Sequence, residues 1–559
     1  MSKVVLLAIN AKYVHSSLAV RVLAGGIRKY ARLLHDVVTV EAATKLINEI
    51  GGEIAESIVC SQPDVIGIST YIWNAGKLPE FMKMLRERLP DTVFVLGGPE
   101  ASFNAEYWLK NGADYVLTGE GEYSFPPLLD ELSERKTAAG AVRGENGAPG
   151  TQPETNPGYL PIPKGPVRSN EPIDPYEDCT IDGCYNITDD RILYLETSRG
   201  CPFNCAFCLS AGSGVRFFPL ETAKKQLYKL SKSGAQTIKL VDRTFNCDAG
   251  RAYELFEYVA GLDTKCSFHF EVAADMFNER TLELLSRAPP GRIRFEAGLQ
   301  SFFIPALKAS TRRTDLEKAE QNIRALLRGR NIHILVDLIA GLPYETLIDF
   351  QNSFDRAYAL NPHALQLGFL KLLHGSELRR QAAALGIFYS EEPPYVIQNS
   401  PWLSAEDVQT LKHAENALQH TYNKGRFLSV LEYALSAAGL RPFSIFRGLG
   451  AAAPNHGAHL ADYAARVYEF FAGLPGVDRN TLRDRMIIDW LGMVKGKNIP
   501  DFLRIPDKKL YSVKEMAKKQ LAHGIRRGEA AVLRSGTGIF VDSEDRDPVT
   551  GLYRVYYTP

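Results

Sequence analysis

Cys201-Pro-Phe-Asn-Cys205-Ala-Phe-Cys208 places three cysteines close together in the middle of the chain. Three thiolates can hold an iron–sulfur cluster, which four cysteines usually saturate. Because a fourth cysteine does not continue the run, one iron would stay open, and catalytic metal sites keep an open position. The run therefore predicts a cluster that binds and activates a substrate. A zinc knuckle that lacks its fourth ligand is the alternative interpretation.

The spacing C-x-x-x-C-x-x-C resembles the signature of the radical S-adenosylmethionine (SAM) proteins. In that family the three thiolates hold a [4Fe-4S] cluster, and its open iron binds the methionine part of SAM. An electron from the cluster then splits SAM into methionine and a 5′-deoxyadenosyl radical. The resemblance implies catalytic and metal-binding roles for Cys201, Cys205 and Cys208, and it places Phe207 against the adenine of SAM.

Composition limits the classes of partner. The 559 residues suffice for three or four domains of ~150 residues. The 65 basic and 65 acidic side chains cancel, so no net field recruits nucleic acid. Apolar runs fall short of the ~20 residues that span a bilayer, and Met1 to Asn10 turn polar too soon for a signal peptide. We expect a cytoplasmic protein without a membrane or nucleic-acid partner, and a reducing compartment also suits an iron–sulfur cluster.

Residues 1–135 alternate short apolar strands with amphipathic helices, which predicts a doubly wound parallel sheet of the flavodoxin-like type. Ligands of such sheets bind beyond the carboxyl ends of the strands. The runs Gly97-Gly98-Pro99-Glu100 and Gly119-Glu120-Gly121-Glu122 follow two predicted strands and resemble loops of the cobalamin-binding domain that precedes many radical SAM cores. The resemblance implies these cobalamin contacts: Ser69, Thr70, Gly97, Gly98, Gly119, Glu120 and Gly121.

One motif of many cobalamin proteins is missing. The D-x-H-x-x-G pattern, which supplies a histidine below the cobalt, is absent, and His15 has a different spacing. The resemblance then implies a cobalt without a protein imidazole, with Ser69, Thr70 or Tyr71 nearest its lower face.

Residues 136–185 are rich in Gly, Pro, Ala, Asn and Thr and have little apolar periodicity, which predicts a flexible linker. Cys179 and Cys184 lie near its end. Their interpretation stays open between ordinary thiols and a redox or second-cluster role.

Residues 186–395 repeat a strand followed by a helix, which predicts a partial (β/α)6 barrel like that of radical SAM enzymes. Its expected strands are residues 192–197, 237–241, 267–272, 292–297, 333–339 and 364–369. Functional side chains of such barrels come from the carboxyl ends of the strands. The resemblance implies these SAM contacts there: Asp242, Asn246, Glu271, Glu296, Gln300, Ser301, Ile339 and Gly341. Capping of the following helix is the alternative role of each acidic residue.

Residues 396–559 are predicted to form a mainly α-helical C-terminal domain that ends in a hairpin and covers the substrate site. The whole pattern predicts a cobalamin-dependent radical SAM methyltransferase that acts on an unactivated carbon of a small-molecule substrate. Such chemistry needs a low-potential electron donor, a ferredoxin or flavodoxin. The alternatives are an oxidative cyclase or rearrangement enzyme with the same cofactors, and a non-catalytic iron–sulfur sensor or binding scaffold.

Overall fold

The structure is a computed structural model. It describes residues 2–43, 51–143, 171–177, 191–455, 457–495, 498–504, 508–521 and 529–558. Most of the predicted linker, with Cys179 and Cys184, lies outside these residues. Within the described part of the chain, none of the helices combines the length and apolar character that crossing a membrane requires.

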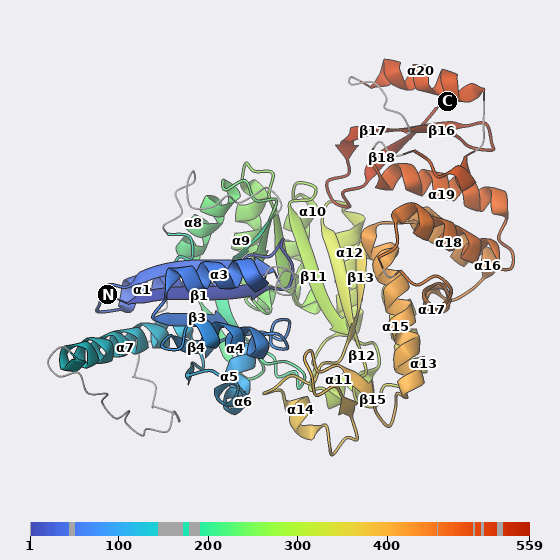
Figure 1. Cartoon of the computed structure of the whole chain (residues 1–559). Coiled ribbons are helices and arrows are strands. Elements are labelled where there is room, and N and C mark those ends of the chain that lie inside the picture. The colour runs from blue at the N-terminus through green and yellow to red at the C-terminus, as the bar shows by residue number, and fades with distance from the viewer. Residues whose placement is uncertain are drawn as a thin grey trace.

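The N-terminal region is a five-stranded parallel sheet in the order β2-β1-β3-β4-β5, shown in blue in Figure 1. Its strands are β1 (Lys3–Asn10), β2 (Asp36–Ala43), β3 (Val65–Ser69), β4 (Val93–Gly97) and β5 (Tyr115–Val116). This is the flavodoxin-like order, which confirms the predicted class. We did not predict β2, which lies at the edge of the sheet and exposes much of its length.

Helices cover both faces of this sheet, so β1 is buried on both sides. Val5, Leu7 and Ile9 belong to one apolar cluster and Val4 and Leu6 to another. The helices are α1 (Leu18–Tyr30), α3 (Gly51–Ser61), α4 (Leu78–Arg88), α5 (Pro99–Phe103), α6 (Ala105–Lys110) and α7 (Gly121–Arg143). Helix α7 continues past the domain end that we expected at residue 135.

The central region is a six-stranded parallel sheet in the order β13-β12-β11-β10-β9-β6. Its strands are β6 (Ile192–Leu195), β9 (Thr237–Leu240), β10 (Ser267–Val272), β11 (Ile293–Gln300), β12 (His333–Ala340) and β13 (Ala364–Phe369). Because β6 and β13 are the two ends of this order, the barrel is open, as predicted. Buried and half-buried residues alternate along β10, β11 and β12, so one face packs on helices and the other lines the interior.

Several short elements and helices complete the barrel. A hairpin, β7 (Ser198–Cys201) and β8 (Gly214–Phe217), follows β6 and carries the cysteine run in its loop. The helices are α8 (Leu220–Ser231), η1 (Phe245–Cys247), α9 (Ala249–Gly261), η2 (Ala274–Met276), α10 (Glu279–Ser286), α11 (Ile304–Ala309), α12 (Leu316–Arg328) and α13 (Leu347–Tyr358).

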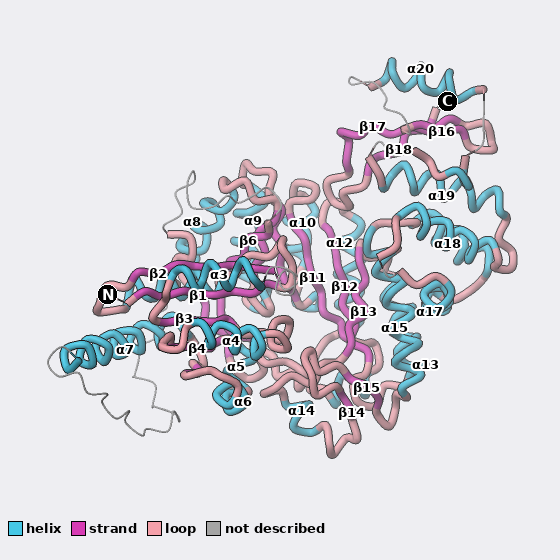
Figure 2. The backbone as a smooth tube through the Cα atoms, in the orientation of Figure 1, coloured by secondary structure: helices cyan, strands magenta, loops and turns pink. Residues whose placement is uncertain are grey.

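The C-terminal region is mainly helical, as predicted, and Figure 2 shows its helices in cyan beside the barrel. It begins with a short segment made of α14 (Glu377–Gln381), β14 (Phe388–Tyr389) and β15 (Ile397–Asn399). The helices that follow are α15 (Ala405–His420), η3 (Tyr422–Lys424), α16 (Leu428–Ala438), α17 (Pro442–Ala452), α18 (Leu460–Ala472), α19 (Arg479–Met493), η4 (Asp501–Leu503) and α20 (Lys509–Gln520). The chain ends in an antiparallel sheet of β16 (Ala530–Val532), β17 (Gly538–Arg546) and β18 (Tyr553–Tyr557), one strand more than the expected hairpin. One apolar core runs from the barrel into helices α15 to α19, so these regions pack as a unit.

Candidate active site

The three cysteines lie on the tight loop between β7 and β8. Cys201 ends β7, Cys205 is buried and Cys208 is half-buried, and all three are free thiols. Gly200 has a φ of +100°, and a Cβ at this position would lie 1.9 Å from the Gly214 carbonyl oxygen. Only glycine therefore permits this close pairing of the two strands, which folds the cysteine loop back on itself.

Two of the thiols meet hydrogen-bonding groups of the chain. The Ser210 amide donates to Cys208 Sγ at 3.4 Å, and Thr244 Oγ1 lies 3.5 Å from Cys201 Sγ. Such groups stabilise thiolate ligands of a cluster. Among the residues that the structure describes, no three His, Cys, Asp or Glu side chains converge on a single metal ion. The thiolates of a four-iron cluster bind separate irons, so they do not need to converge on one point.

Arg312 is a cation beside the third thiol, and we did not select it from the sequence. Its Nη1 donates to Cys205 Sγ at 3.6 Å and its Nη2 to the Gly298 carbonyl at 2.7 Å. The same segment holds the cysteine loop, because the Ala206 amide donates to the Ser310 carbonyl at 2.9 Å. Burial raises the pKa of Cys205, and the charge of Arg312 opposes that rise.

Charged side chains from neighbouring strands meet inside the barrel. Lys239 Nζ lies 2.9 Å from Glu296 Oε2 and 3.2 Å from Glu271 Oε1, and His269 Nε2 lies 2.9 Å from the same Glu296 oxygen. Burial opposes ionisation of Glu296, but the hydrogen bond from His269 and the charge of Lys239 lower its pKa to about 2. Two of the expected SAM contacts, Glu271 and Glu296, are thus ion-paired within the chain.

Two polar groups near the ends of β11 and β12 remain available. Gln300 adopts a φ of +72° at a shift in register between Gly298 and Gln300. Such strained positions and bulges often aim side chains at ligands. Asp337 Oδ1 is sealed from solvent and has no hydrogen-bond partner. Burial, the charges of Glu296 and Glu271, and a hydrogen bond between the Asp337 carboxyl and Glu296 raise its pKa. Asp337 lies in the same strand, two residues before Ile339, which we selected together with Gly341.

Asp242 and Asn246, two expected SAM contacts, use their polar atoms within the chain. Asp242 is buried and accepts hydrogen bonds from the Thr197 amide (2.9 Å), Thr197 Oγ1 (2.7 Å) and Ser198 Oγ (2.6 Å). Burial raises its pKa to about 6. The Asn246 amide group exchanges two hydrogen bonds with the backbone of Ala273, at 2.8 and 2.9 Å. Both side chains therefore fix the strand ends.

Ser301 is also engaged, since its hydroxyl bonds to the buried carboxyl of Glu345. Burial raises the pKa of Glu345 to about 8, and its Oε2 has no partner. Ile339 and Phe207 pack at the edge of one apolar group. Gly341 has a φ of +94° and faces Ile397, a residue of that group. These three expected residues form an apolar surface next to the cysteine loop.

The expected cobalamin contacts gather at the carboxyl ends of β3 and β4. The Thr70 amide donates to the Gly97 carbonyl at 2.8 Å, and the Thr70 hydroxyl is buried without a partner. Gly98 has a φ of +96°, and a Cβ there would lie 2.7 Å from the Thr70 carbonyl oxygen. Ser69 is buried and its hydroxyl lies 3.4 Å from the Leu7 carbonyl.

Two further features fit a flat ligand at this edge. Gly119 has a φ of +79° with open space where a Cβ would stand. Tyr71 and Trp73 stack with ring centroids 4.3 Å apart, and Trp73 donates to the Ile9 carbonyl. The orphaned hydroxyl, the bare glycine backbone and the aromatic pair together fit a cobalamin site.

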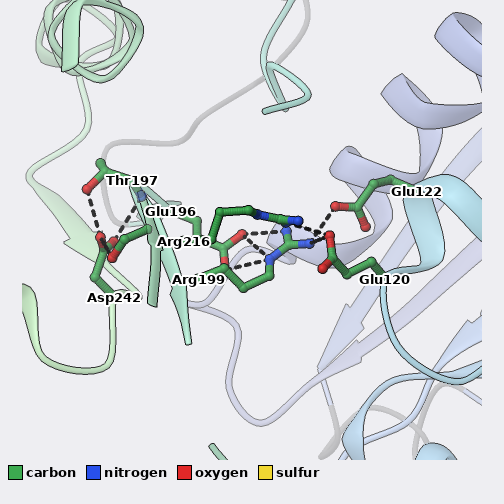
Figure 3. A network of polar contacts seen from close by, with 8 residues as sticks. Glu120, Glu122, Glu196, Thr197, Arg199, Arg216 and Asp242 are labelled. Carbon is green, nitrogen blue, oxygen red and sulfur yellow. Dashed lines mark hydrogen bonds and ion pairs between the residues drawn. The ribbon is translucent and has the colours of Figure 1, made fainter. Parts of the chain in front are cut away.

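The loop with Gly119, Glu120 and Gly121 contacts the cysteine hairpin through ion pairs. In Figure 3 the Arg199 guanidinium reaches Glu196 (2.6 Å) on its own side and Glu120 (2.6 Å) and Glu122 (2.7 Å) on the N-terminal domain. Arg216 adds a second bond to Glu120 at 2.6 Å. The Glu120 carboxylate, which we expected to contact cobalamin, therefore ties that loop to the barrel.

A second connection joins the same two regions. The Tyr395 hydroxyl donates to the carboxylate of Glu100, which follows Gly97 and Gly98, at 2.5 Å. The Leu378 amide donates to the Ala206 carbonyl in the cysteine loop at 2.9 Å. The segment from α14 to β15 thus contacts both the cysteine loop and the N-terminal domain.

Comparison with known families divides the chain as the fold does. Residues 4–129 match the B12 binding domain, residues 195–357 match the Radical SAM superfamily, and residues 383–528 match a protein family of unknown function, DUF4080.

Two curated relatives of this chain are a methyltransferase and a methylase. It is 23% identical to the cobalamin-dependent radical SAM methyltransferase TokK of Streptomyces tokunonensis, over 78% of this chain and 65% of TokK. It is 27% identical to the hopanoid C-3 methylase of Methylococcus capsulatus, over 50% of this chain and 53% of that protein. The chain therefore spans between half and two thirds of the length of these relatives. The structure of the radical SAM methyltransferase TsrM of Kitasatospora setae superposes with a TM-score of 0.52 at 17% identity, covering 71% of this chain and 80% of TsrM.

The chain therefore combines a domain that matches the B12 binding domain with a domain that matches the Radical SAM superfamily and contains the cysteine run. Its C-terminal region matches the DUF4080 family. The matched domain classes confirm the three predicted cofactors, which are cobalamin, a [4Fe-4S] cluster and SAM.

Proposed function

We propose that this protein is a cobalamin-dependent radical SAM methyltransferase that acts on an unactivated carbon of a small molecule. The observation that carries the proposal is the ion-pair network of Arg199, two residues before Cys201, with Glu120 in the glycine-rich loop. This network holds the two cofactor regions side by side. Methyl transfer needs both near one substrate carbon, and fixed proximity is a major source of rate enhancement.

The proposed roles follow from the contacts above. Cys201, Cys205 and Cys208 hold the cluster, and the Arg312 cation lies where it can neutralise the carboxylate of SAM. Asp337 offers an unpaired oxygen to a hydroxyl group of SAM.

The remaining proposed contacts are apolar or backbone contacts. Phe207 and Ile339 offer an apolar surface to adenine. Thr70 and Gly98 would contact cobalamin at the carboxyl ends of β3 and β4, with Tyr71 beside them.

When bound, the cluster supplies the electron that splits SAM, and cobalamin carries the methyl group. The chain itself orients these groups and keeps water away from them. We further propose a cytoplasmic location and a ferredoxin or flavodoxin as electron donor, because splitting a sulfonium needs a low-potential electron and the cluster needs reducing surroundings.

Anaerobic reconstitution with iron and sulfide, followed by SAM and dithionite, tests the proposal. We expect cluster absorbance and 5′-deoxyadenosine from the natural protein and neither from Cys205→Ala. Cys60→Ala is the matched control, because Cys60 is exposed and outside the loop. Formation of 5′-deoxyadenosine by Cys205→Ala would refute the ligand assignment. Cobalt near one equivalent per chain after growth with cobalamin is expected as well.

Product mass separates the proposed reaction from the cyclase alternative. Methylation adds one methylene to the substrate, whereas oxidative cyclisation removes hydrogens. A chain that binds a cluster but never cleaves SAM would instead be a sensor or scaffold.

A further inference from the structure

A polar cavity lies between the open edge of the barrel and the first long helix of the C-terminal region. Its volume is about 280 Å³, and it is lined by Gln366, Leu367, Glu415, Leu418, Gln419 and Asn423. The first two residues belong to β13, the edge strand, and α15 contributes three of the others. Figure 1 shows α15 running beside β13. The cavity approaches the size of small-ligand sites.

The cavity is built by the way α15 closes the sheet edge. Asn423 donates to the Leu365 carbonyl at 2.8 Å and accepts from the Leu365 amide at 2.9 Å, so it pairs with β13 as a strand would. Glu415 and Gln419 lie one turn apart on the same face of α15, and Asn423 follows in η3. In a strand, the amide and carbonyl groups of every second residue point to the same edge of the sheet. The amide and carbonyl of Leu367 therefore face α15, as those of Leu365 face Asn423.

The lining has an unusual charge balance. It contains the carboxyl group of Glu415 and three carboxamides but no lysine or arginine. In the described chain Glu415 has no hydrogen bond or ion pair, and burial raises its pKa while only the charge of His420 opposes the rise. A half-buried carboxylate without a partner is unfavourable unless a ligand supplies the missing charge or donor.

Gln366 lines this cavity and also lies on the sheet face that carries Asp337. It stands opposite Asp337 in the register of β12 and β13, so both side chains lie on the same face of the sheet. Gln419 accepts a hydrogen bond from Asn423 at 3.2 Å, which leaves the amide hydrogens of Gln419 for a ligand.

We propose that this cavity binds an amine-bearing part of the substrate, with Glu415 accepting from the ammonium group and Gln366 and Gln419 bonding to adjacent polar atoms. The inference rests on the proposed function and names its substrate class, a small molecule with a primary amine. The DUF4080 region would then select the substrate, while the barrel and the N-terminal domain carry out the chemistry.

The test uses three probes of matched length with the full chain, 1,5-diaminopentane, 1,5-pentanediol and glutarate, and calorimetric titration. We expect the diamine to bind at least tenfold more tightly than the diol and glutarate not to bind. Glu415→Gln keeps the shape of the side chain and should lose at least tenfold in diamine affinity. Glu406→Gln, an exposed position on the same helix, is the matched control and should bind normally.

Three results would overturn the inference: equal binding of diamine and diol, tighter binding of glutarate, or unchanged diamine binding by Glu415→Gln. The assay needs neither cluster nor SAM, so its outcome is separate from that of 5′-deoxyadenosine formation. A chain that cleaves SAM but ignores the diamine keeps the proposed function and loses this substrate class. A chain that binds the diamine through Glu415 but never cleaves SAM loses the proposed function alone.

Discussion

Replacing Arg199 by methionine should loosen the contact between the N-terminal domain and the cysteine hairpin. The substitution keeps the aliphatic stem and removes a guanidinium that is bonded to Glu196, Glu120 and Glu122 at 2.6 to 2.7 Å. The arginine side chain is 26% exposed and that of Glu122 only 9%. Removing one partner of a buried ion pair costs about 3–5 kcal/mol, and exposed pairs contribute about 0–1 kcal/mol. Arg216 still neutralises Glu120, so we expect a loss of about 2–4 kcal/mol.

Hydrogen exchange of the backbone amides of residues 119–124, measured by mass spectrometry, reports this loss locally. If those amides exchange through opening of the contact, a loss of 2–4 kcal/mol means roughly 30- to 700-fold faster exchange. Arg88→Met is the matched control, because Arg88 forms an exposed pair with Glu56 in the same domain, far along the chain from this loop. Combining Arg199→Met with Glu122→Gln should recover part of the protection, since it removes an unpaired charge. Exchange in Arg199→Met that matches the Arg88→Met control would refute the reasoning.

Two further substitutions, at Glu345 and Gly98, test the barrel and the proposed cobalamin site at the carboxyl ends of β3 and β4. Burial raises the pKa of Glu345 from 4.5 to about 8, so the folded chain favours the neutral acid. The contribution of this group to the free energy of unfolding is complete below pH 4.5 and is lost as the pH rises through 8. The loss is about 5 kcal/mol at most. Thermal unfolding between pH 5 and 9 should therefore show the natural protein losing stability relative to Glu345→Gln as pH rises, and parallel curves would contradict this. Gly98→Ala forces a Cβ to 2.7 Å from the Thr70 carbonyl oxygen, so we expect a lower melting temperature and less bound cobalt, whereas Gly76→Ala, where a Cβ meets nothing, should change neither. Normal cobalt content in Gly98→Ala would contradict the proposed cobalamin edge.

Much of the fold could be predicted because its strands carry a strong local signal. The six barrel strands are apolar or alternate with a period of two, and each is followed by a helix. The edge strand Asp36–Ala43 gave no such signal, because an edge strand packs less of its surface. Helix Pro442–Ala452 was also missed, because its two glycines, Gly448 and Gly450, are poor helix formers.

The site was less predictable because side-chain partners are not local in sequence. Strand ends located Glu271 and Gln300, but nothing near Asp242 indicated that Thr197 and Ser198 would use its carboxylate. Arg312 became a candidate only when folding brought it next to Cys205, 107 residues earlier in the chain. Position at a strand end thus predicted which side chains lie close together, but not which of their polar atoms are free.

The short distance from Arg199 to Cys201 has a consequence for how this architecture can diversify. Two residues of extended chain reach about 7 Å, so Arg199, which anchors the loop with Glu120, and Cys201, the proposed cluster ligand, cannot move apart without breaking the hairpin. Under the proposed function, the space between the two cofactors would then keep a nearly constant width. Different substrates would have to enter from the open edge of the barrel, where helix α15 of the C-terminal region packs beside β13.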